Sequence, residues 1–381
     1  MLDQKHLFSL SEDESYLNGA SRSPQLRSAA EAARAALRWR EQNSGMPIAD
    51  FFEPVARLRH AFARLVQAPD PDRVALIPAA SYGLATVARN LPLSKGQEIV
   101  VVEDQFPSNY YIWQRRCVET GATLRTVARP RAGENWSQRV LEAITPRTAA
   151  VAIAQLHWSD GYRFDLEAIR QRTDEVDAWL VVDGTQSVGV FPFDVQRIRP
   201  DALVAGGYKW LLGPYGCGYA WYGPRLDGGV PLEENWINRA GSEDFSRLAE
   251  YQSNYRPLAG RYCVGQHSNF IMLPMQLAAL EQLLAWERDD MQTYLEGLWT
   301  PLLDPLRELN VEVTQPAAWH LVGLRFARPA VVARLPQALT KHGVSVSYRG
   351  DAVRVSPNVY NTPADMKRLL AGIREAAAGE G

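Results

Sequence analysis

The sequence predicts an α/β protein with a large, mostly parallel sheet and a second, smaller α+β domain. Between residues 73 and 210, short apolar runs alternate with helical stretches. Apolar runs without polar alternation are typical of strands buried on both faces of a parallel sheet. The chain has 381 residues, 46% of them hydrophobic. This length and composition suit one large α/β unit and a smaller domain.

The charge balance and the cysteines argue against several classes of protein. Forty-one Lys and Arg residues against 43 Asp and Glu residues give a net charge of −2, so no global field favours nucleic acid or a membrane as a partner. Three widely spaced cysteines argue against a disulfide framework or a structural zinc site. The acidic N-terminus lacks the apolar core of a signal peptide, and no apolar run approaches the roughly 20 residues of a membrane span. We therefore expect a cytoplasmic protein with no bound metal.

The first 48 residues are expected to form an arm and a helix that packs with the small domain. The helix, rich in Ala and Arg, should cover Ser28–Glu41. Gly45 and Pro47 break the helical pattern before a second amphipathic helix at residues 51–66. This second helix opens the large domain, predicted to cover residues 49–265.

Five apolar runs predict the strands of the large domain. They are VALIPAA (74–80), EIVVVED (98–104), TAAVAIAQL (148–156), AWLVVDG (178–184) and ALVAGGYKW (202–210). A helical stretch follows each of the first three runs. Strands that alternate with helices imply parallel pairing through crossover connections.

The pattern changes after Asn269, which predicts a small domain over residues 266–381. Residues 274–299 suggest one long helix, and shorter strands and helices follow it. Thr362 is expected to cap the last helix, with Pro363 in its first turn and Asp365 three positions after the cap.

Two neighbouring strands end near residues whose side chains can take part in catalysis. Ligands of open parallel α/β sheets bind at the carboxyl ends of strands. AWLVVDG ends in Asp183, although an Asp before Gly is also a common turn. ALVAGGYKW places Lys209 between Tyr208 and Trp210. A buried lysine loses its proton more readily, and a neutral amine can form an imine with an aldehyde. The alternative is a lysine that snorkels from an apolar patch.

A third strand end resembles an anion site. VALIPAA runs into Ser81, Tyr82 and Gly83 at the start of a helix. Backbone N–H groups and a hydroxyl at a helix N-terminus can bind phosphate, although an ordinary serine cap has the same appearance. The chain has neither a Walker loop nor a GxGxxG motif there, which argues against ATP and dinucleotides.

The combination of an acid, a lysine 26 residues later and a phosphate-type turn matches the needs of pyridoxal 5'-phosphate (PLP). The lysine would form the imine, the acid would keep the pyridine nitrogen protonated, and the helix terminus would hold the phosphate.

Residues 181–221, VVDGTQSVGVFPFDVQRIRPDALVAGGYKWLLGPYGCGYAW, closely resemble class V aminotransferases. That group also includes cysteine desulfurases, kynureninases, isopenicillin N epimerases and C–S lyases. The resemblance extends from YLNGA at Tyr16 to RVSPNVYNT at residues 354–362. It implies the fold-type-I PLP architecture and a homodimer with active sites at the interface.

The resemblance also implies roles for residues around the cofactor. Lys209 corresponds to the Schiff-base lysine, Asp183 to the partner of the pyridine nitrogen, and Gln186 to a contact of the ring hydroxyl. Ser81, Tyr82, Gly83 and Tyr208 correspond to the phosphate site, while Phe106 stacks on the ring where desulfurases have His. Asp160 falls where many relatives have an Asn near the ring hydroxyl, and an anion there would repel a phenolate-like oxygen unless a proton is shared. Gly265 and Gln266 correspond to the crossing where a neighbouring subunit reaches the phosphate.

Substrate contacts are implied at three further positions. Arg354 matches the arginine that binds the substrate carboxylate, and a guanidinium suits that bidentate contact. Asn18 and Arg22 lie in the N-terminal arm that relatives bring to the pocket, although Arg22 is equally compatible with a solvated surface position.

The resemblance leaves the reaction on the α-amino-acid substrate open. An aminotransferase that acts through an imine between substrate and cofactor is the leading expectation, with a C–S lyase or an epimerase as alternatives. Desulfurases carry a nucleophilic Cys on the loop before the arginine strand, and the corresponding HGVSVSYRGDA contains none. A cofactor-free binding protein is disfavoured by the intact Asp183, Lys209 and Arg354 set, and an NAD-dependent dehydrogenase by the missing glycine motif.

Overall fold

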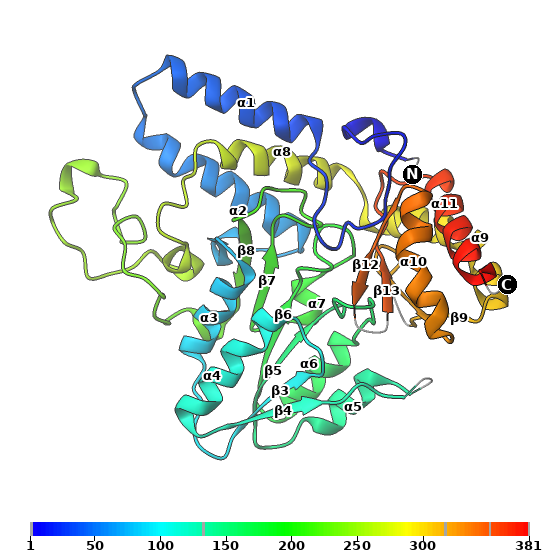
Figure 1. The fold of residues 1–381 in the computed structure, drawn as a ribbon. Coiled ribbons are helices and arrows are strands. Elements are labelled where there is room, and N and C mark those ends of the chain that lie inside the picture. The colour runs from blue at the N-terminus through cyan, green and yellow to red at the C-terminus, as the bar shows by residue number, and fades with distance from the viewer. Residues whose placement is uncertain (1–2, 132–133, 316–317, 350–351, 380–381) are drawn as a thin grey trace.

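A seven-stranded sheet forms the centre of the large domain. The computed structural model describes residues 3–131, 134–315, 318–349 and 352–379 (Figure 1). The strand order is β2-β8-β7-β6-β5-β3-β4, and β8 alone runs antiparallel to its neighbours. The strands are β2 (Val74–Ile77), β3 (Glu98–Val102), β4 (Thr123–Val127), β5 (Thr148–Ala154), β6 (Trp179–Asp183), β7 (Ala202–Gly206) and β8 (Gly218–Tyr222). The predicted α/β class with a mostly parallel sheet is confirmed.

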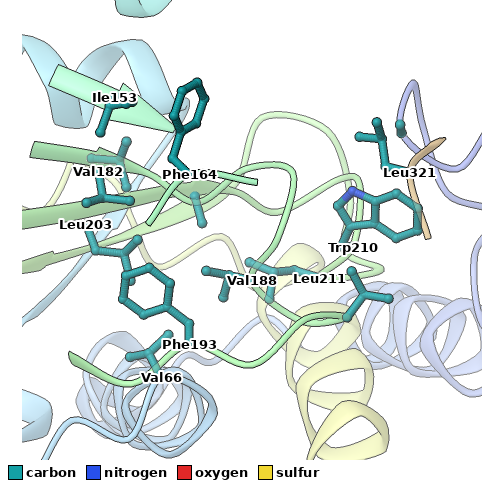
Figure 2. Packing of buried hydrophobic residues seen from close by; sticks show 14 of the residues in the cluster. Val66, Ile153, Phe164, Val182, Val188, Phe193, Leu203, Trp210, Leu211 and Leu321 are labelled. Carbon is teal, nitrogen blue, oxygen red and sulfur yellow. The ribbon is translucent and has the colours of Figure 1, made fainter. Parts of the chain in front are cut away.

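All five predicted strands form, and two unpredicted strands join them. The crossover helices are α3 (Ala80–Asn90), α4 (Tyr111–Thr120), α5 (Trp136–Ala143), α6 (Leu166–Glu175) and the short α7 (Val195–Ile198). The predicted runs are buried because these helices cover the sheet: α3 packs against β7 and β8, α4 against β3, α5 against β4, and α6 against β6. Figure 2 shows how Ile153, Val182 and Leu203 from three neighbouring strands line up in the core.

The small domain contains a four-stranded antiparallel sheet of order β12-β13-β10-β9. Its strands are β9 (Val311–Val313), β10 (Val322–Phe326), β12 (Ser347–Arg349) and β13 (Ala352–Val355). Helix α11 (Pro363–Ala378) packs against α10 (Pro329–Lys341) and begins at the predicted capping box of Thr362 and Asp365. The N-terminal arm joins this domain, because β1 (Ser15–Tyr16) pairs with β11 (Val344–Ser345).

The predicted long helix at residues 274–299 is wrong: the structure has two helices there. Helix α8 (Met272–Ala285) ends at Trp286, and α9 (Arg288–Glu308) begins after Glu287, with both intervening residues extended. Acids at positions 289 and 290 lie in the first turn of α9, where negative charge favours a helix start. Helix α8 packs against α1 (Arg27–Gln42) and α2 (Glu53–Leu65).

The connection from β8 to α8 is long and irregular, and it projects from one side of the molecule (Figure 1). It contains the last three of the short 3₁₀ helices that the described residues form. These helices are Lys5–Leu7, Ile48–Phe51, Pro71–Arg73, Pro107–Asn109, Pro224–Leu226, Phe245–Arg247 and Leu258–Tyr262. Within the described ranges, no helix is both long and apolar enough to cross a bilayer. The predicted domain boundaries remain a prediction.

Candidate active site

The carboxyl ends of β6 and β7 bring two of the predicted residues to one cavity. Asp183 is the last residue of β6, and its register partner is Val204 of β7. Lys209 follows three residues after the end of β7. Both side chains line a cavity of about 210 Å³. Adjacent parallel strands therefore place the acid and the lysine together, as the strand-end argument predicts.

Lys209 is buried without a carboxylate in ion-pair contact among the described residues. Burial and, next, the charge of Arg354 lower the pKa of its amine to about 8, although the charge of Asp183 opposes the shift. The Nζ atom lies 5.4 Å from the Phe106 ring centroid and 5.5 Å from that of Tyr208. These aromatic walls limit hydration of the amine, so roughly a tenth to a fifth of it is neutral near pH 7, far more than for a free lysine.

Asp183 is buried and its charge is incompletely matched. The backbone N–H of Thr185 donates to its Oδ1 atom at 2.9 Å. Burial raises the pKa of Asp183, while the hydrogen bonds from Thr185 and the charge of Lys209 oppose that rise. A cationic N–H group placed in the cavity would stabilise the carboxylate and would itself be held protonated.

Gln186 is fixed at the cavity wall by both ends of its amide. Its Nε2 donates to the carbonyl of Ala20 at 3.1 Å, and its Oε1 accepts from Trp210 Nε1 at 2.9 Å. His320 Nε2 lies 2.8 Å from the backbone carbonyl of Gln186. Gln186 thus links the strand-end loop to the N-terminal arm and to the small domain.

The helix start after β2 contributes only part of the predicted phosphate turn. Ser81 lines the cavity with Ala79 and Ala80, whereas Tyr82 and Gly83 do not. The first N–H groups of a helix have no intrahelical acceptor, so those of Ala80 and Ser81 are suited to an anion.

Tyr82 and Gly83 have contacts that explain their positions without a ligand. The Tyr82 hydroxyl donates to Glu233 Oε1 at 3.0 Å, and burial raises its pKa. A Cβ at Gly83 would lie 2.7 Å from Val204 Cγ1, so this glycine lets α3 pack closely on β7.

Asp160 lies outside the cavity, which differs from the implied contact with the ring hydroxyl. Its Oδ2 accepts from Arg129 Nη1 at 2.5 Å and from Arg325 Nη2 at 2.9 Å. Burial would raise the pKa of Asp160, but His157 and the two arginines outweigh it and hold the pKa below its usual range. The arginines supply the countercharge that an anion at this position needs. The carboxylate connects the large domain to β10 of the small domain.

Arg354 is not among the residues that line the cavity, but it contacts Trp158, which is. Its Nη1 donates to the Trp158 carbonyl at 2.8 Å, and its Nη2 donates to Ser21 Oγ at 2.7 Å. Its buried Nε has no partner within the described part of the chain. Burial, and then the charge of Arg349, lower the pKa of Arg354 to about 9. A buried guanidinium without a carboxylate is a suitable partner for a carboxylate from solution.

Asn18 supports the arginine, and Arg22 does not reach the cavity. The Oδ1 atom of Asn18 accepts from Ser21 Oγ at 2.8 Å and from Ser347 Oγ at 2.7 Å. Both hydroxyls also contact Arg354. Arg22 is exposed, and its backbone carbonyl accepts from the Tyr16 hydroxyl at 2.7 Å. The structure therefore joins Asn18 to the site and leaves Arg22 at the surface.

Gly265 and Gln266 are absent from the lining of this chain's own cavity. The Gly265 N–H donates to Glu233, and Gln266 is exposed with a φ of 58°. Their predicted contact with a neighbouring subunit stays a prediction.

Several cavity residues were not predicted. Gln105 and Asn109 each carry a buried side-chain atom without a partner among the described residues, and both line the cavity. Cys217 also lines the cavity, where burial raises the pKa of its thiol to about 11. The run EDQFPSN contained the polar residues, yet nothing in their spacing separated them from ordinary loop residues.

The described residues fit PLP on several independent points. Lys209 offers a buried amine, Asp183 an acceptor that needs a cationic donor, and Ser81 a helix start that suits a phosphate. Phe106 contributes an aromatic face 37% exposed, and the unpartnered amide atoms of Gln105 and Asn109 leave polar capacity for a ligand. Among the described residues, no group of three or more His, Cys, Asp or Glu side chains could hold a metal ion.

Sequence comparison relates the chain to a large family. The family model described as aminotransferase class-V matches residues 43–369. The uncharacterised aminotransferase YcbU of Bacillus subtilis (strain 168) is 25% identical over 313 residues, 82% of this chain and 81% of that protein. Isopenicillin N epimerase of Streptomyces clavuligerus is 28% identical over 182 residues, 47% of this chain and 46% of that protein.

Solved structures share the fold over nearly the whole chain. The cysteine desulfurase CsdA of Escherichia coli matches with a TM-score of 0.82 at 21% identity, covering 98% of this chain and 97% of that one. The cystine C–S lyase C-DES matches with a TM-score of 0.85 at 20% identity, covering 96% and 98%. The fold-type-I architecture implied by the sequence is thereby confirmed.

Proposed function

The chain belongs to the class V aminotransferase family of PLP-dependent enzymes, and on that premise we propose that it is an aminotransferase of α-amino acids that holds PLP on Lys209. The observation that carries this proposal is the buried amine of Lys209, with its pKa lowered to about 8, at the strand end next to Asp183.

Bound PLP supplies an electron sink for the bond that breaks at the substrate's α-carbon. Lys209 Nζ is the base that moves the α-proton, because its amine lies in the cavity and can be neutral. Asp183 would hold the pyridine nitrogen in its protonated form. Ser81 and the adjacent N–H groups would hold the phosphate.

Arg354 orients the substrate by binding its α-carboxylate. Its position on β13 is fixed by Ser21 and Ser347, which Asn18 holds in turn. Phe106 and Trp158, whose ring centroids lie 5.5 Å apart, exclude water from the reacting end of the cavity. Neither Tyr82 nor Asp160 has a role in cofactor binding in this proposal.

A second copy of the chain completes the site in this proposal. Ser81 and Ala79 are exposed in the single chain although they line the cavity. The projecting connection carries exposed apolar side chains at Val230, Trp236 and Tyr251, and Gln266 lies on the same segment. A homodimer would bury these groups and bring Gln266 to the phosphate of the partner site.

A C–S lyase is the second candidate, supported by the match over nearly the whole chain to the cystine C–S lyase C-DES. An epimerase is a third and weaker candidate. A Cys-dependent desulfurase is disfavoured, because residues 342–355 contain no Cys and the thiol of Cys217 has a pKa raised to about 11.

The number of product molecules formed per active site, in the absence of a 2-oxo acid acceptor, distinguishes an aminotransferase from a lyase. A panel of amino acids would be mixed with enzyme in the absence of any 2-oxo acid, and products would be counted per site. An aminotransferase should form one equivalent of 2-oxo product and stop until an oxo acid is added. Continuous turnover with ammonia and a thiol as products would identify the lyase. Inversion at the α-carbon without oxo product would identify the epimerase.

A further inference from the structure

Arg349 lies on β12, the strand next to the one that carries Arg354. The register pairs Ser347 with Arg354, so these two side chains share one face of the sheet. Arg349 is two residues beyond Ser347 on the same strand, and side chains two apart point to the same face. The Ser347 hydroxyl, 3.4 Å from Arg354 Nη2, marks this face as the one turned toward the site.

Trp158 connects both guanidinium groups to the cavity. The Cζ atom of Arg349 lies 5.5 Å from the centroid of the Trp158 ring. The carbonyl of the same residue accepts from Arg354, and its ring contacts Phe106 at the cavity wall. Arg349 is therefore held beside the site by an aromatic contact rather than by an acid.

Two positive charges meet here without an anion. Neither Arg349 nor Arg354 forms an ion pair with a described carboxylate, and the buried Nε of each lacks a hydrogen-bond partner among the described residues. Among the described residues, the side chain of Arg349 donates one hydrogen bond, from Nη1 to the Tyr348 carbonyl at 2.8 Å. The charge of Arg349 contributes to the lowered pKa of Arg354 and of Lys209. An anion from solution would stabilise this arrangement.

We propose that Arg349 binds a second carboxylate of the substrate, so that the enzyme acts on acidic amino acids or dicarboxylic 2-oxo acids. This inference rests on the proposed function, since it assigns the α-carboxylate to Arg354. Diagonal neighbours on an antiparallel strand pair lie about 7–8 Å apart, and a short dicarboxylate can bridge two flexible arginines at that spacing. A substrate with a neutral side chain would leave Arg349 without an anion.

The test measures binding of two five-carbon acids to the holoenzyme by calorimetry. Glutarate and pentanoate have equal chain length and differ by one carboxylate. The wild type should bind glutarate about tenfold more tightly or better. Arg349→Gln should reduce this preference to about twofold or less, mainly by weakening the binding of glutarate. Arg349→Lys should retain part of the preference. Arg64→Gln, which removes an exposed arginine elsewhere, should leave both affinities unchanged.

Equal affinity of the wild type for the two acids would overturn the inference. Equal loss of both affinities in Arg349→Gln would also overturn it, because Arg349 would then attract anions without discriminating among them. Borohydride labelling of the same samples reports separately on the proposed function. A pyridoxyl group on Lys209 with no glutarate preference refutes only the second carboxylate site. Absence of the label from Lys209 refutes the proposed function, and this inference with it.

Discussion

Lys209 owes its lowered pKa mainly to burial, which disfavours the charged amine. A free lysine titrates near pH 10.4, whereas Lys209 titrates near 8 in the folded chain. Between these two values the unfolded chain binds more protons than the folded one. The contribution of Lys209 to the free energy of unfolding therefore rises with pH across that window.

The rate at which cofactor-free protein captures PLP should follow the neutral fraction of Lys209. Since only the unprotonated amine attacks an aldehyde, the rate should rise with pH and level off above a midpoint near 8. Stopped-flow absorbance across about pH 6 to pH 10 measures this profile, with Lys209→Ala as the control that forms no covalent link. A midpoint near that of free lysine would contradict the burial of the amine.

The sequence predicted the position of a side chain in the site best where it also predicted the strands next to it. Asp183 and Lys209 follow neighbouring apolar strands, so their meeting depends only on strand order. Asp160 was assigned to the ring hydroxyl by resemblance, but Arg129 and Arg325 are 31 and 165 residues away along the chain. Only the tertiary structure brings those arginines to it.

The turn after β5 is the element that joins the two domains. The Asp160 carboxylate accepts hydrogen bonds from Arg129 of the large domain and from Arg325 of the small domain. Its backbone carbonyl accepts from the Gly323 N–H at 2.9 Å. Gly161 has a φ of 78°, and a Cβ there would lie 1.9 Å from the Leu321 carbonyl oxygen. The turn and β10 are therefore in direct backbone contact.

Asp160→Asn should lower the free energy of unfolding at pH 7 by roughly 2 kcal/mol, because the amide keeps the size but removes the negative charge that pairs with Arg129 and Arg325. The pKa of Asp160 is lowered in the folded chain, so its stabilisation is present above the unfolded pKa near 3.9 and is lost as pH falls toward the folded value. Urea unfolding of both proteins should give a difference that shrinks below about pH 4. A constant difference at all pH values would refute the ionic role.

At the element scale, the prediction failed where local pattern and tertiary context disagreed. The edge strand β4 has the sequence TLRTV, and its polar residues do not match the apolar pattern of the buried strands. Across α8 and α9, helix-forming residues continue without interruption, so the local pattern does not mark the break at Trp286, whose side chain is buried. The place of Cys217 at the cavity was not predicted, because β8, which begins at the next residue, was not recognised as a strand.

The whole molecule leaves its cavity exposed where the proposed dimer would cover it. A hybrid of Lys209→Ala and Gln266→Ala chains tests that arrangement. If Gln266 completes the partner's site, each variant is impaired on its own. In a mixed dimer, one site combines Lys209 of the Gln266→Ala chain with Gln266 of the Lys209→Ala chain and is intact. Equal mixing should then restore about a quarter of wild-type activity. No recovery in a mixture shown to contain hybrid dimers would mean that each chain completes its own site.

Borohydride reduction followed by peptide mapping identifies the lysine that holds the cofactor. The reduced holoenzyme should carry one pyridoxyl group per chain, on the peptide that contains Lys209, and Lys209→Ala should carry none after the same treatment. A pyridoxyl group on any other lysine, or its absence from a protein saturated with PLP, would contradict the account.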